Sequence, residues 1–462
     1  MAKRVFVSIL ISIMTTFLFA ENGLSMKQVE KLAQSVQLEG TNKLIYNAVT
    51  NNDINELALD RQVMNQYSTL VNFKLDVKGI TNQKSTGRCW MFAALNTIRP
   101  LVIEKYELSS FEFSQNYLFF YDKLEKANMF LDEMINLTKE DLMNRDVEEL
   151  IGDPIPDGGW WNYAVDLIGK YGVVPKEIMP ETISSESSRM LNSILSKLLK
   201  HNAMELRNLA DKGAKKDKLL ARKNEMLEDV YRVLVLNLGK PVTEFDWRFE
   251  NKDKEIRTLH FTPQEFYKEA VGLDLSEYVT VLEHPVYEFN DHYTIEYCRG
   301  MSNVPDMDFV NISSGDFKEW TKNALQDSLP VWFAATSGPG MSRENGIMDP
   351  NLYDYETLFD IEMTFTKKEA LQYGWGIPNH AMVFVGMDLD DNGNVSKWLV
   401  ENSWGKERGD GGYYTMSSDW FDKFVFNVIL PKKYLPENVQ QLLKKKTQKI
   451  PSWDPMRETF LK

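Results

Sequence analysis

The segment QKSTGRCW, at residues 83–90, places a cysteine in a setting that suits nucleophilic chemistry. A thiol is a useful nucleophile only as the thiolate, so a catalytic cysteine needs a positive field around its sulfur. Cys89 stands at the start of a predicted helix, whose macrodipole supplies such a field. Its backbone N–H is then free to donate, and Gln83 can fold back to bring a side-chain amide beside it, with Gly87 permitting the close chain approach. We therefore expect Cys89 to be the nucleophile and these two donors to form an oxyanion hole.

A thiolate nucleophile needs a base, and His380 is the best placed of the five histidines. It lies in PNHAMVFVG, residues 378–386, at the entrance to an apolar strand, and ENSWG follows at residues 401–405. The chain order Cys, His, Asn, with the histidine far downstream, is the order found in papain-like peptidases. We expect Asn402 to orient the imidazole and Trp404 to shield that hydrogen bond from water. Trp90 is expected to cover the flank of the nucleophile.

The remaining histidines and the second cysteine do not form a second constellation in the sequence. His201 falls in a basic helical stretch, and three more fall in β regions without a neighbouring carboxylate or cysteine cluster: His260, His284 and His292. A lone cysteine is usually a small buried hydrophobe, which is how we interpret Cys298. A lone histidine is usually structural as well, but here three segments agree in residue type, order and context. No metal-ligand spacing, phosphate loop or dinucleotide motif is present, so no metal and no cofactor are expected.

Buried elements must hold these residues in place. The apolar run from Cys89 to Glu104 predicts a central helix that Pro100 ends or kinks. Alternating or apolar patterns predict strands at residues 71–77, 278–281, 293–298, 330–335, 381–388 and 397–401. Residues 390–393, with the sequence DDNG, are a turn signal between the last two strands. Helices are predicted within residues 112–146, at 162–171, over the long basic stretch 184–236, and from Tyr434 onwards.

The N-terminus has the layout of a secretory signal peptide. Lys3 and Arg4 precede an apolar run that ends at Ala20, and the sequence then becomes abruptly polar. The run is shorter than the roughly 20 residues that a membrane span needs. We expect cleavage near Ala20 and an exported protein, periplasmic or secreted, with no membrane association in its mature form. An uncleaved N-terminal anchor is the alternative.

Composition limits the classes of function. The 462 residues carry a formal net charge of −14, and 43% of them are hydrophobic, which is enough for a substantial core. A chain this acidic is a poor general binder of nucleic acid, because phosphate binding needs a basic surface. No nucleic-acid partner is therefore expected.

At these residues the chain resembles the bleomycin hydrolase and bacterial aminopeptidase C family of papain-like cysteine peptidases. The resemblance extends beyond the three catalytic segments to TNQKSTGRCWMFAALNTIRP, PDGGWWNYAVDLIGKYGVVPKEIMPE, TPQEFYKEAVG, LPVWFAATSG, KWLVENSWGKERGDGGYYTMSSDWFD and the terminal WDPM. These blocks begin at residues 81, 156, 262, 329, 397 and 453, so the resemblance spans most of the mature chain.

The resemblance implies an α+β, papain-like fold with a cleft between a helical and a β-barrel-like subdomain. Combined with the N-terminal pattern, it gives the expected boundaries: a signal peptide at 1–20, an N-terminal segment at 21–80, a helical catalytic subdomain at 81–183, a helical insertion at 184–260, a β-rich catalytic subdomain at 261–430 and a C-terminal helix with an active-site arm at 431–462. Asp157, Gly158 and Gly159 match the cleft-wall segment whose backbone pairs with extended substrate.

The resemblance also implies an assembly and a substrate class. Members form homohexamers around a chamber, so that only peptides or unfolded chains reach the thiols. A C-terminal arm lies in the cleft, and its terminal carboxylate, here that of Lys462, receives the α-ammonium group of the substrate. The implied activity is that of an aminopeptidase that removes N-terminal residues from peptides.

The sequence departs from the family at its tail and its N-terminus. The segment after WDPM is short and built of small residues in the family, whereas here it is Arg457-Glu458-Thr459-Phe460-Leu461-Lys462. Family members are usually cytosolic and lack a signal peptide. Asn379, before His380, replaces a frequent threonine. The altered tail leaves an endopeptidase or a dipeptide-releasing peptidase open as the alternative enzyme, and an inactive oligomeric scaffold as the alternative without catalysis.

Overall fold

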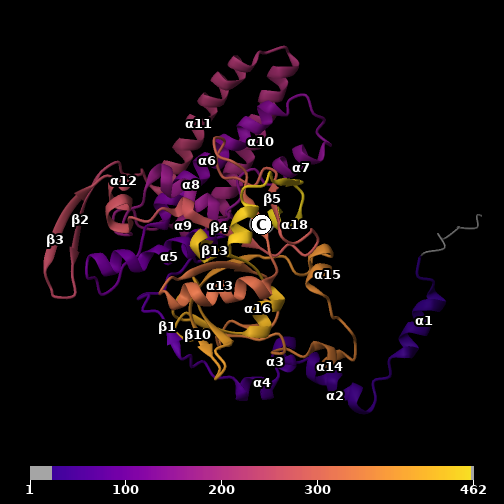
Figure 1. Ribbon diagram of the computed structural model, residues 1–462. Helices are drawn as coiled ribbons and strands as arrows, with labels where there is room; N and C mark the ends of the chain where they lie inside the picture. Colours follow the sequence, from indigo (N-terminus) through magenta and orange to yellow (C-terminus); the bar gives the residue numbers. More distant parts are fainter. Residues whose placement is uncertain (1–22, 459–462) are drawn as a thin grey trace, which may run out of the picture. The chain divides into compact units, whose positions relative to one another are not determined.

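A computed structural model describes residues 23–458 (Figure 1), so the predicted signal peptide and Lys462 lie outside the described part of the chain. The chain divides into two compact units. The first takes in the chain up to Leu59 together with Asp354–Ile361, and the second contains Asp60–Tyr353 and the rest of the chain from Glu362. None of the helices between residues 23 and 458 has both the length and the apolar character needed to cross a bilayer.

In its described part, from residue 23, the first unit consists of four short helices: α1 (Met26–Ser35), α2 (Gly40–Val49), α3 (Ile54–Ala58) and α14 (Tyr355–Phe359). Ser25 closes a capping box with Gln28 at the start of α1, and Asp53 caps α3. No residue of α1 is buried, although Met26, Val29 and Leu32 repeat at helical spacing. The first unit therefore leaves an apolar helical stripe exposed.

The second unit is built around the helix that Cys89 begins, α5 (Cys89–Lys105). Almost all of α5 is buried, and it packs against α6 (Gln115–Asn136), α8 (Trp161–Tyr171) and strand β10 (His380–Leu389). The helix predicted over Cys89–Glu104 is present and continues to Lys105, so of the two effects expected of Pro100, an end or a kink, the end does not occur. A proline inside a helix costs about 3 kcal/mol. Burial on all sides of α5 offsets that cost.

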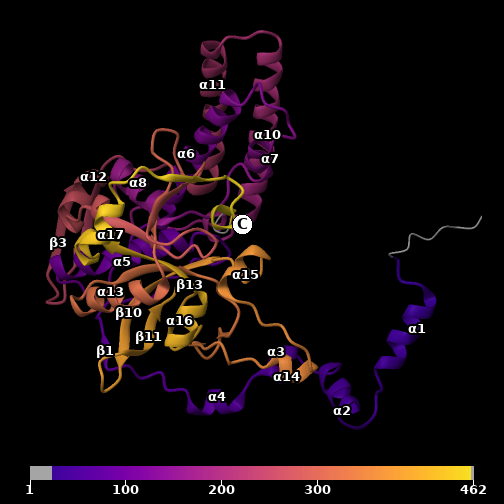
Figure 2. The same ribbon diagram turned by 45° about the vertical axis from the view of Figure 1, so that its right-hand side comes forward.

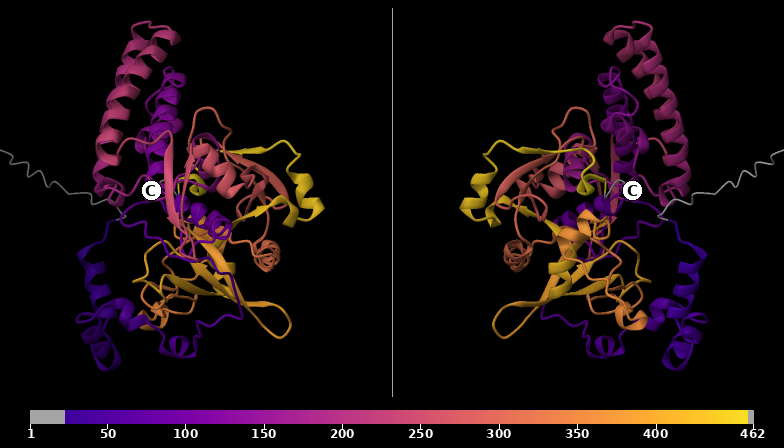
Figure 3. Two further views of the ribbon diagram at one scale, coloured as in Figure 1. Left: turned by 90° about the vertical axis from the view of Figure 1, so that its left-hand side faces the viewer. Right: turned by 90° about the vertical axis from the view of Figure 1, so that its right-hand side faces the viewer.

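The helical insertion is a hairpin of two long helices, α10 (Arg189–Asp211) and α11 (Lys216–Leu238), joined at a glycine, Gly213, with positive φ. Figures 2 and 3 show this hairpin extending away from the sheet of the second unit. Its seam is apolar, with leucines of α10 facing α11 and α6 (Leu191, Leu195, Leu199 and Leu206).

Residues 245–261, expected to belong to the helical insertion, instead form a two-stranded antiparallel sheet of β2 (Phe245–Glu250) and β3 (Ile256–Phe261). The residues of β2 alternate between buried and exposed, which is the period of a half-buried strand. Trp247 and Phe249 stack on its buried face with ring centroids 4.1 Å apart. This aromatic packing explains why the segment is a strand.

A twelve-stranded sheet forms the rest of the core in the described chain, in the order β14-β5-β6-β4-β13-β7-β10-β11-β12-β9-β8, with β1 added beside β10. Its strands are β1 (Phe73–Lys74), β4 (Tyr278–Leu282), β5 (Asp291–Ile295), β6 (Asp308–Asn311), β7 (Val331–Ala335), β8 (Met341–Ser342), β9 (Ile347–Met348), β10, β11 (Val395–Glu401), β12 (Tyr413–Ser417), β13 (Val425–Pro431) and β14 (Gln448–Ile450). The strand expected at 71–77 is reduced to Phe73–Lys74, because only these residues pair with Met387 and Gly386 of β10.

Shorter helices connect these elements: α4 (Arg61–Gln66), α7 (Arg145–Gly152), α9 (Ile183–Glu186), α12 (Pro263–Phe266), α13 (Ser314–Gln326), α15 (Lys367–Gln372), α16 (Ser418–Phe424), α17 (Glu437–Leu442) and α18 (Pro455–Glu458). A π-helical turn (Tyr267–Val271) and two 3₁₀ turns (Leu275–Glu277 and Lys432–Tyr434) complete them. The helix expected from Tyr434 onwards is confined to α17, and the chain then enters β14.

The register of the sheet brings two predicted residues together. β10 and β11 are antiparallel, with Val383 opposite Glu401. His380 is the first residue of β10, and Asn402 directly follows the last residue of β11. Antiparallel pairing places these two strand ends side by side.

Candidate active site

Cys89 is the first residue of α5 and is 4% exposed. Burial raises the pKa of the Cys89 thiol to about 11, while the backbone N–H groups of Ala381, Trp90 and Cys89 itself act in the opposite direction. Ala381 directly follows His380, so its contact with the sulfur brings the start of β10 to the N-terminus of α5. These N–H donors are the groups that stabilise a thiolate when one forms.

The imidazole of His380 is held by Asn402, with 2.8 Å between Nε2 and the amide Oδ1. The same Oδ1 accepts the backbone N–H of Ser403 at 2.7 Å. Because a backbone N–H can only donate, the atom of the Asn402 side-chain amide that it contacts must be the oxygen. That oxygen is an acceptor, so Nε2 of His380 must carry the hydrogen of their hydrogen bond. The neutral imidazole therefore keeps its lone pair on Nδ1, which is the tautomer that a base requires.

Burial lowers the pKa of His380 to about 4, against the smaller opposing effect of its hydrogen bond to Asn402. The indole of Trp404 stacks on the imidazole, with ring centroids 4.6 Å apart and an interplanar angle of 26°. Burial therefore acts against the charged form of both groups, the Cys89 thiolate and the His380 imidazolium.

Gln83 lies in the same site and is oriented by the residue after Asn402. Its Oε1 accepts a hydrogen bond from Ser403 Oγ at 2.7 Å, and its backbone N–H donates to the Ser403 carbonyl at 2.9 Å. Its Nε2 donates one hydrogen to the Thr86 carbonyl at 2.7 Å. A side-chain amide carries two such hydrogens, so one remains to serve an oxyanion.

The cleft-wall segment at Asp157 is fixed through its side chain. The carboxylate binds Lys123 Nζ at 2.7 Å and accepts from Asn192 Nδ2 at 2.7 Å, from the Gly87 N–H at 3.1 Å and from the Ser188 hydroxyl. Burial alone would raise the pKa of Asp157, but Lys123 and these donors hold it well below its usual range. Because the Asp157 carboxylate is occupied by these hydrogen bonds and this ion pair within the chain, we expect the segment to contact substrate through its backbone.

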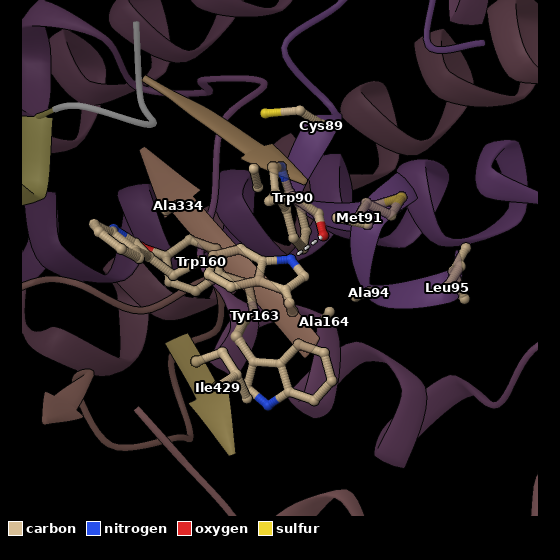
Figure 4. Close-up of a cluster of buried hydrophobic side chains, with 14 of the residues drawn as sticks. Cys89, Trp90, Met91, Ala94, Leu95, Trp160, Tyr163, Ala164, Ala334 and Ile429 are labelled. Atoms are coloured by element: carbon tan, nitrogen blue, oxygen red, sulfur yellow. Dashed lines mark hydrogen bonds between the residues drawn. The ribbon is translucent and has the colours of Figure 1, made fainter. Parts of the chain in front are cut away.

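Trp90 does not have the position expected of it. Its side chain is completely buried, and its indole N–H donates to the Asp157 carbonyl at 2.9 Å. The indole meets the ring of Tyr163 edge to face, with ring centroids 6.0 Å apart, and Figure 4 draws it within the buried cluster that also holds Trp160 and Ala164. Trp90 therefore supports the cleft wall from behind and does not face a substrate.

Glycine at 159 is required by this packing. A Cβ placed there would lie 2.7 Å from Trp90 Cε2 and 2.9 Å from Tyr163 Cδ2. The neighbouring carbonyl, that of Gly158, accepts a hydrogen bond from the buried Lys126 Nζ at 2.6 Å. Lys126 was not foreseen as part of the site, because its place 32 residues before Gly158 gives no local signal.

The C-terminal arm is anchored through Asp454, whose carboxylate contacts His284 Nε2 at 3.0 Å and Tyr287 Oη at 3.2 Å. Three further histidines, His260, His284 and His292, each meet a carboxylate in space, that of Asp246, Asp454 and Asp308 respectively. Only the fold brings these partners together.

The first residue of the altered tail, Arg457, is buried, and its guanidinium donates to the carbonyls of Tyr297 and Ser452. It lines a small cavity with Lys126, Pro156 and Tyr163, which also support the cleft wall. The described part of the arm therefore ends beside the cleft-wall segment. Cys298 is a free, buried thiol, as expected.

Comparisons with known proteins agree with this site. The sequence profile of the Peptidase C1-like family matches residues 23–457. Aminopeptidase C of Streptococcus thermophilus is 36% identical over 436 residues, which cover 94% of this chain and 98% of that protein. Bleomycin hydrolase of Homo sapiens is 33% identical over 449 residues, covering 95% and 99% respectively. The crystal structure of PepW from Lactobacillus rhamnosis HN001 matches with a TM-score of 0.91 at 37% identity, covering 94% of this chain and 99% of that one.

These matches confirm the resemblance that the sequence motifs indicated, and with it the expected α+β architecture. The chain belongs to the Peptidase C1-like family and is a cysteine peptidase with a papain-like fold.

Proposed function

We propose that this protein is a thiol aminopeptidase, with Cys89 as nucleophile, His380 as base, Asn402 as the residue that orients the base and Gln83 as oxyanion donor. The observation that carries the proposal is the arrangement around His380. Asn402 holds Nε2 at 2.8 Å, and the next residue, Ala381, contributes an N–H to the sulfur of Cys89. Relatives named aminopeptidase C, 36% identical over 94% of the chain, support the same activity.

The first half of the reaction follows from these positions. Cys89 transfers its proton to Nδ1 of His380, and the thiolate attacks the substrate carbonyl carbon. The oxygen that becomes negative receives the Cys89 backbone N–H and the remaining Gln83 Nε2 hydrogen. The tetrahedral intermediate collapses, the C–N bond breaks, and the imidazolium gives its proton to the leaving amine. An acyl-enzyme on Cys89 remains.

In the second half, a water molecule replaces the amine beside the imidazole. His380 takes its proton as the oxygen attacks the thioester carbonyl, and the C–S bond then breaks to release the acid and regenerate the thiol. Asn402 and Trp404 keep the imidazole in one orientation throughout both halves.

The arm sets the cleavage register in this proposal. Its anchors at Asp454 and Arg457 hold the chain beside the cleft wall. In this proposal the carboxylate of Lys462, which lies outside the described residues, receives the α-ammonium group of a peptide. Exclusion of longer occupants from the acyl side makes cleavage exopeptidic. An endopeptidase or dipeptide-releasing peptidase is the second candidate, favoured by the longer tail.

Two substrates and one truncation test the register. The intact enzyme is expected to hydrolyse aminoacyl fluorogenic amides faster than the same amides with a blocked N-terminus. Truncation after Glu458 keeps the Arg457 anchor and removes only the last four residues, so it should raise turnover of blocked substrates. Faster hydrolysis of blocked substrates by the intact enzyme would overturn the aminopeptidase assignment. Stoichiometric labelling of Cys89 by an epoxide inhibitor separates either peptidase from an inactive scaffold.

We also propose that the protein assembles as a homohexamer. The support lies in the family resemblance and in the apolar stripe of α1, formed by Met26, Val29 and Leu32, which another copy of the chain would cover. Charged substitution on this stripe, such as Leu32→Asp, is expected to lower the sedimentation coefficient. Lys31→Asp changes charge on the same helix without touching the stripe and serves as its control. A monomeric wild type would overturn the assembly.

Export is proposed from residues 1–20, which lie outside the described structure. Cell fractionation with N-terminal sequencing of the recovered protein tests it. The expected result is a periplasmic or secreted protein that begins near Glu21 and acts on peptides. A cytosolic protein that begins at Met1 or Ala2 would contradict the proposal.

A further inference from the structure

Arg343 stands over the tryptophan that stacks on the active-site histidine. Its guanidinium carbon lies 4.8 Å from the ring centroid of Trp404, and Trp404 in turn stacks on His380 at 4.6 Å. The side chain is exposed, so it is open to a bound molecule. Within residues 23–458, this guanidinium lies against the indole and forms no ion pair with a carboxylate.

The backbone of Arg343 is fixed, which gives the side chain a defined origin. It lies in the tight turn between β8 and β9, and its carbonyl accepts the Gly409 N–H at 2.9 Å and the Tyr414 hydroxyl at 3.0 Å. A guanidinium that is both anchored at its base and laid on an indole loses less entropy on binding than a free surface cation.

The chemistry of the proposed reaction identifies what this cation faces. The imidazole must touch the leaving nitrogen in order to protonate it, whereas the acyl part of the substrate stays on the sulfur. Groups that neighbour the imidazole therefore neighbour the leaving fragment. Trp404 and Arg343 are such groups, and Trp404 also bridges to Asn82, next to Gln83, at the rim of the site.

The electrostatic influence of Arg343 on the site agrees with this placement. Burial is the main cause of the low pKa of His380, and the positive charge of Arg343 lowers it further. A second exposed cation, Arg408, also lies near Tyr414 but does not lie over Trp404. Both cations act on the Tyr414 hydroxyl, whose pKa burial raises to about 12, but only Arg343 lies over Trp404.

We infer that Arg343 is a specificity-determining residue that binds a carboxylate on the leaving fragment of the substrate. The inference rests on the proposed roles of Cys89 and His380. The carboxylate has two sources of the same chemistry: the side chain of Asp or Glu directly after the cleaved bond, or the C-terminus of a dipeptide. Both place an anion on the residue that carries the leaving nitrogen, and a guanidinium matches the planar geometry of a carboxylate.

Two matched substrate pairs test the inference. Ala-Asp-Ala-amide against Ala-Asn-Ala-amide isolates the side-chain carboxylate, and the dipeptide Ala-Ala against Ala-Ala-amide isolates the terminal one. The wild type is expected to prefer the anionic member of at least one pair by about fivefold in kcat/KM, mainly through KM, as suits a partly exposed ion pair. In Arg343→Gln the ratio should fall to about one, with an intermediate value in Arg343→Lys.

Arg408→Gln is the matched control, since it removes an exposed positive charge near Tyr414 but not the one over Trp404, and it should keep the wild-type ratio. An aminoacyl fluorogenic amide has an uncharged leaving group, so Arg343→Gln should lose less kcat/KM on it than on the anionic substrates. A wild type without preference in either pair, an unchanged ratio in Arg343→Gln, or an equal loss on the uncharged amide would each overturn the inference.

The same pairs with acetylated N-termini separate this inference from the proposed function. Cleavage of the peptides with free N-termini, and not of the acetylated ones, would show that the enzyme is an aminopeptidase. The ratio of kcat/KM between the anionic and the neutral member of a pair tests the role of Arg343, whether the enzyme cleaves the free or the acetylated peptides.

Discussion

Arg99 on α5 and Glu401 at the end of β11 form an ion pair, with 2.8 Å between Nη2 and Oε2, and both side chains are almost completely buried. Arg99 belongs to the helix that begins at Cys89, and Glu401 directly precedes Asn402. The pair therefore ties the element that carries the nucleophile to the strand that orients the base. Arg99 also donates to the carbonyls of Val77 and Gly79.

Removing one partner of this pair should be strongly destabilising. Arg99→Met leaves the Glu401 carboxylate buried and unpaired, which costs about 3–5 kcal/mol of unfolding free energy. The double variant Arg99→Met with Glu401→Leu removes both charges and is expected to lose less than the sum of the two single losses. Urea unfolding of the four proteins gives the coupling energy. Additive losses would show that the two side chains do not interact.

Gln83→Ala should reduce kcat by about 10²–10³, the usual cost of one oxyanion donor. Ser403→Ala offers a graded comparison, because it removes the hydroxyl that holds Gln83 Oε1 at 2.7 Å but leaves the amide in place. We expect a smaller loss of kcat from this variant. Steady-state kinetics on an aminoacyl amide measures both, and a loss below roughly tenfold in Gln83→Ala would exclude the oxyanion role.

The sequence could predict the elements that carry the site because their signals are local. The helix that begins at Cys89 and the strands at 381–388 and 397–401 follow from continuous apolar runs, and the structure has α5, β10 and β11 there. The adjacency of His380 and Asn402 follows from the hairpin between the two strands, which the DDNG turn indicated.

What the sequence could not predict depends on contacts between distant residues. Arg99 and Glu401 are 302 positions apart, and His284 meets Asp454 across 170 positions. Trp90 has the type and position of a residue that flanks a nucleophile, but the helical phase of α5 turns its ring into the core against Gly159. The prediction that Pro100 could end its helix rests on the low helix propensity of proline. The extensive burial of α5 outweighs that propensity, and the helix continues past Pro100.

The stability of the protein should fall in weak acid because of His380. Its pKa is about 4 when folded, against 6.5 for the free side chain, so below pH 6.5 the unfolded chain binds more protons than the folded one. The contribution is fully present above pH 6.5 and is lost as the pH falls towards 4, with a total of about 3 kcal/mol. Unfolding free energies between pH 7 and 4.5 measure it. His380→Gln lacks this titration and should show a flatter dependence, and equal slopes in the two proteins would contradict the assignment.

Gly159→Ala should damage the cleft wall while leaving the proposed catalytic residues intact. The added Cβ would lie 2.7 Å from Trp90 and 2.9 Å from Tyr163, both rings that are held on all sides, so overpacking should cost about 1–3 kcal/mol. Because Trp90 also holds the Asp157 carbonyl, we expect KM for peptides to rise more than kcat falls. Gly169→Ala, in the same α8 region, meets nothing within 4 Å and should be neutral or slightly stabilising. Thermal unfolding and steady-state kinetics of both variants test this, and a Gly159→Ala protein as stable and as active as Gly169→Ala would show that the cleft wall does not depend on this contact.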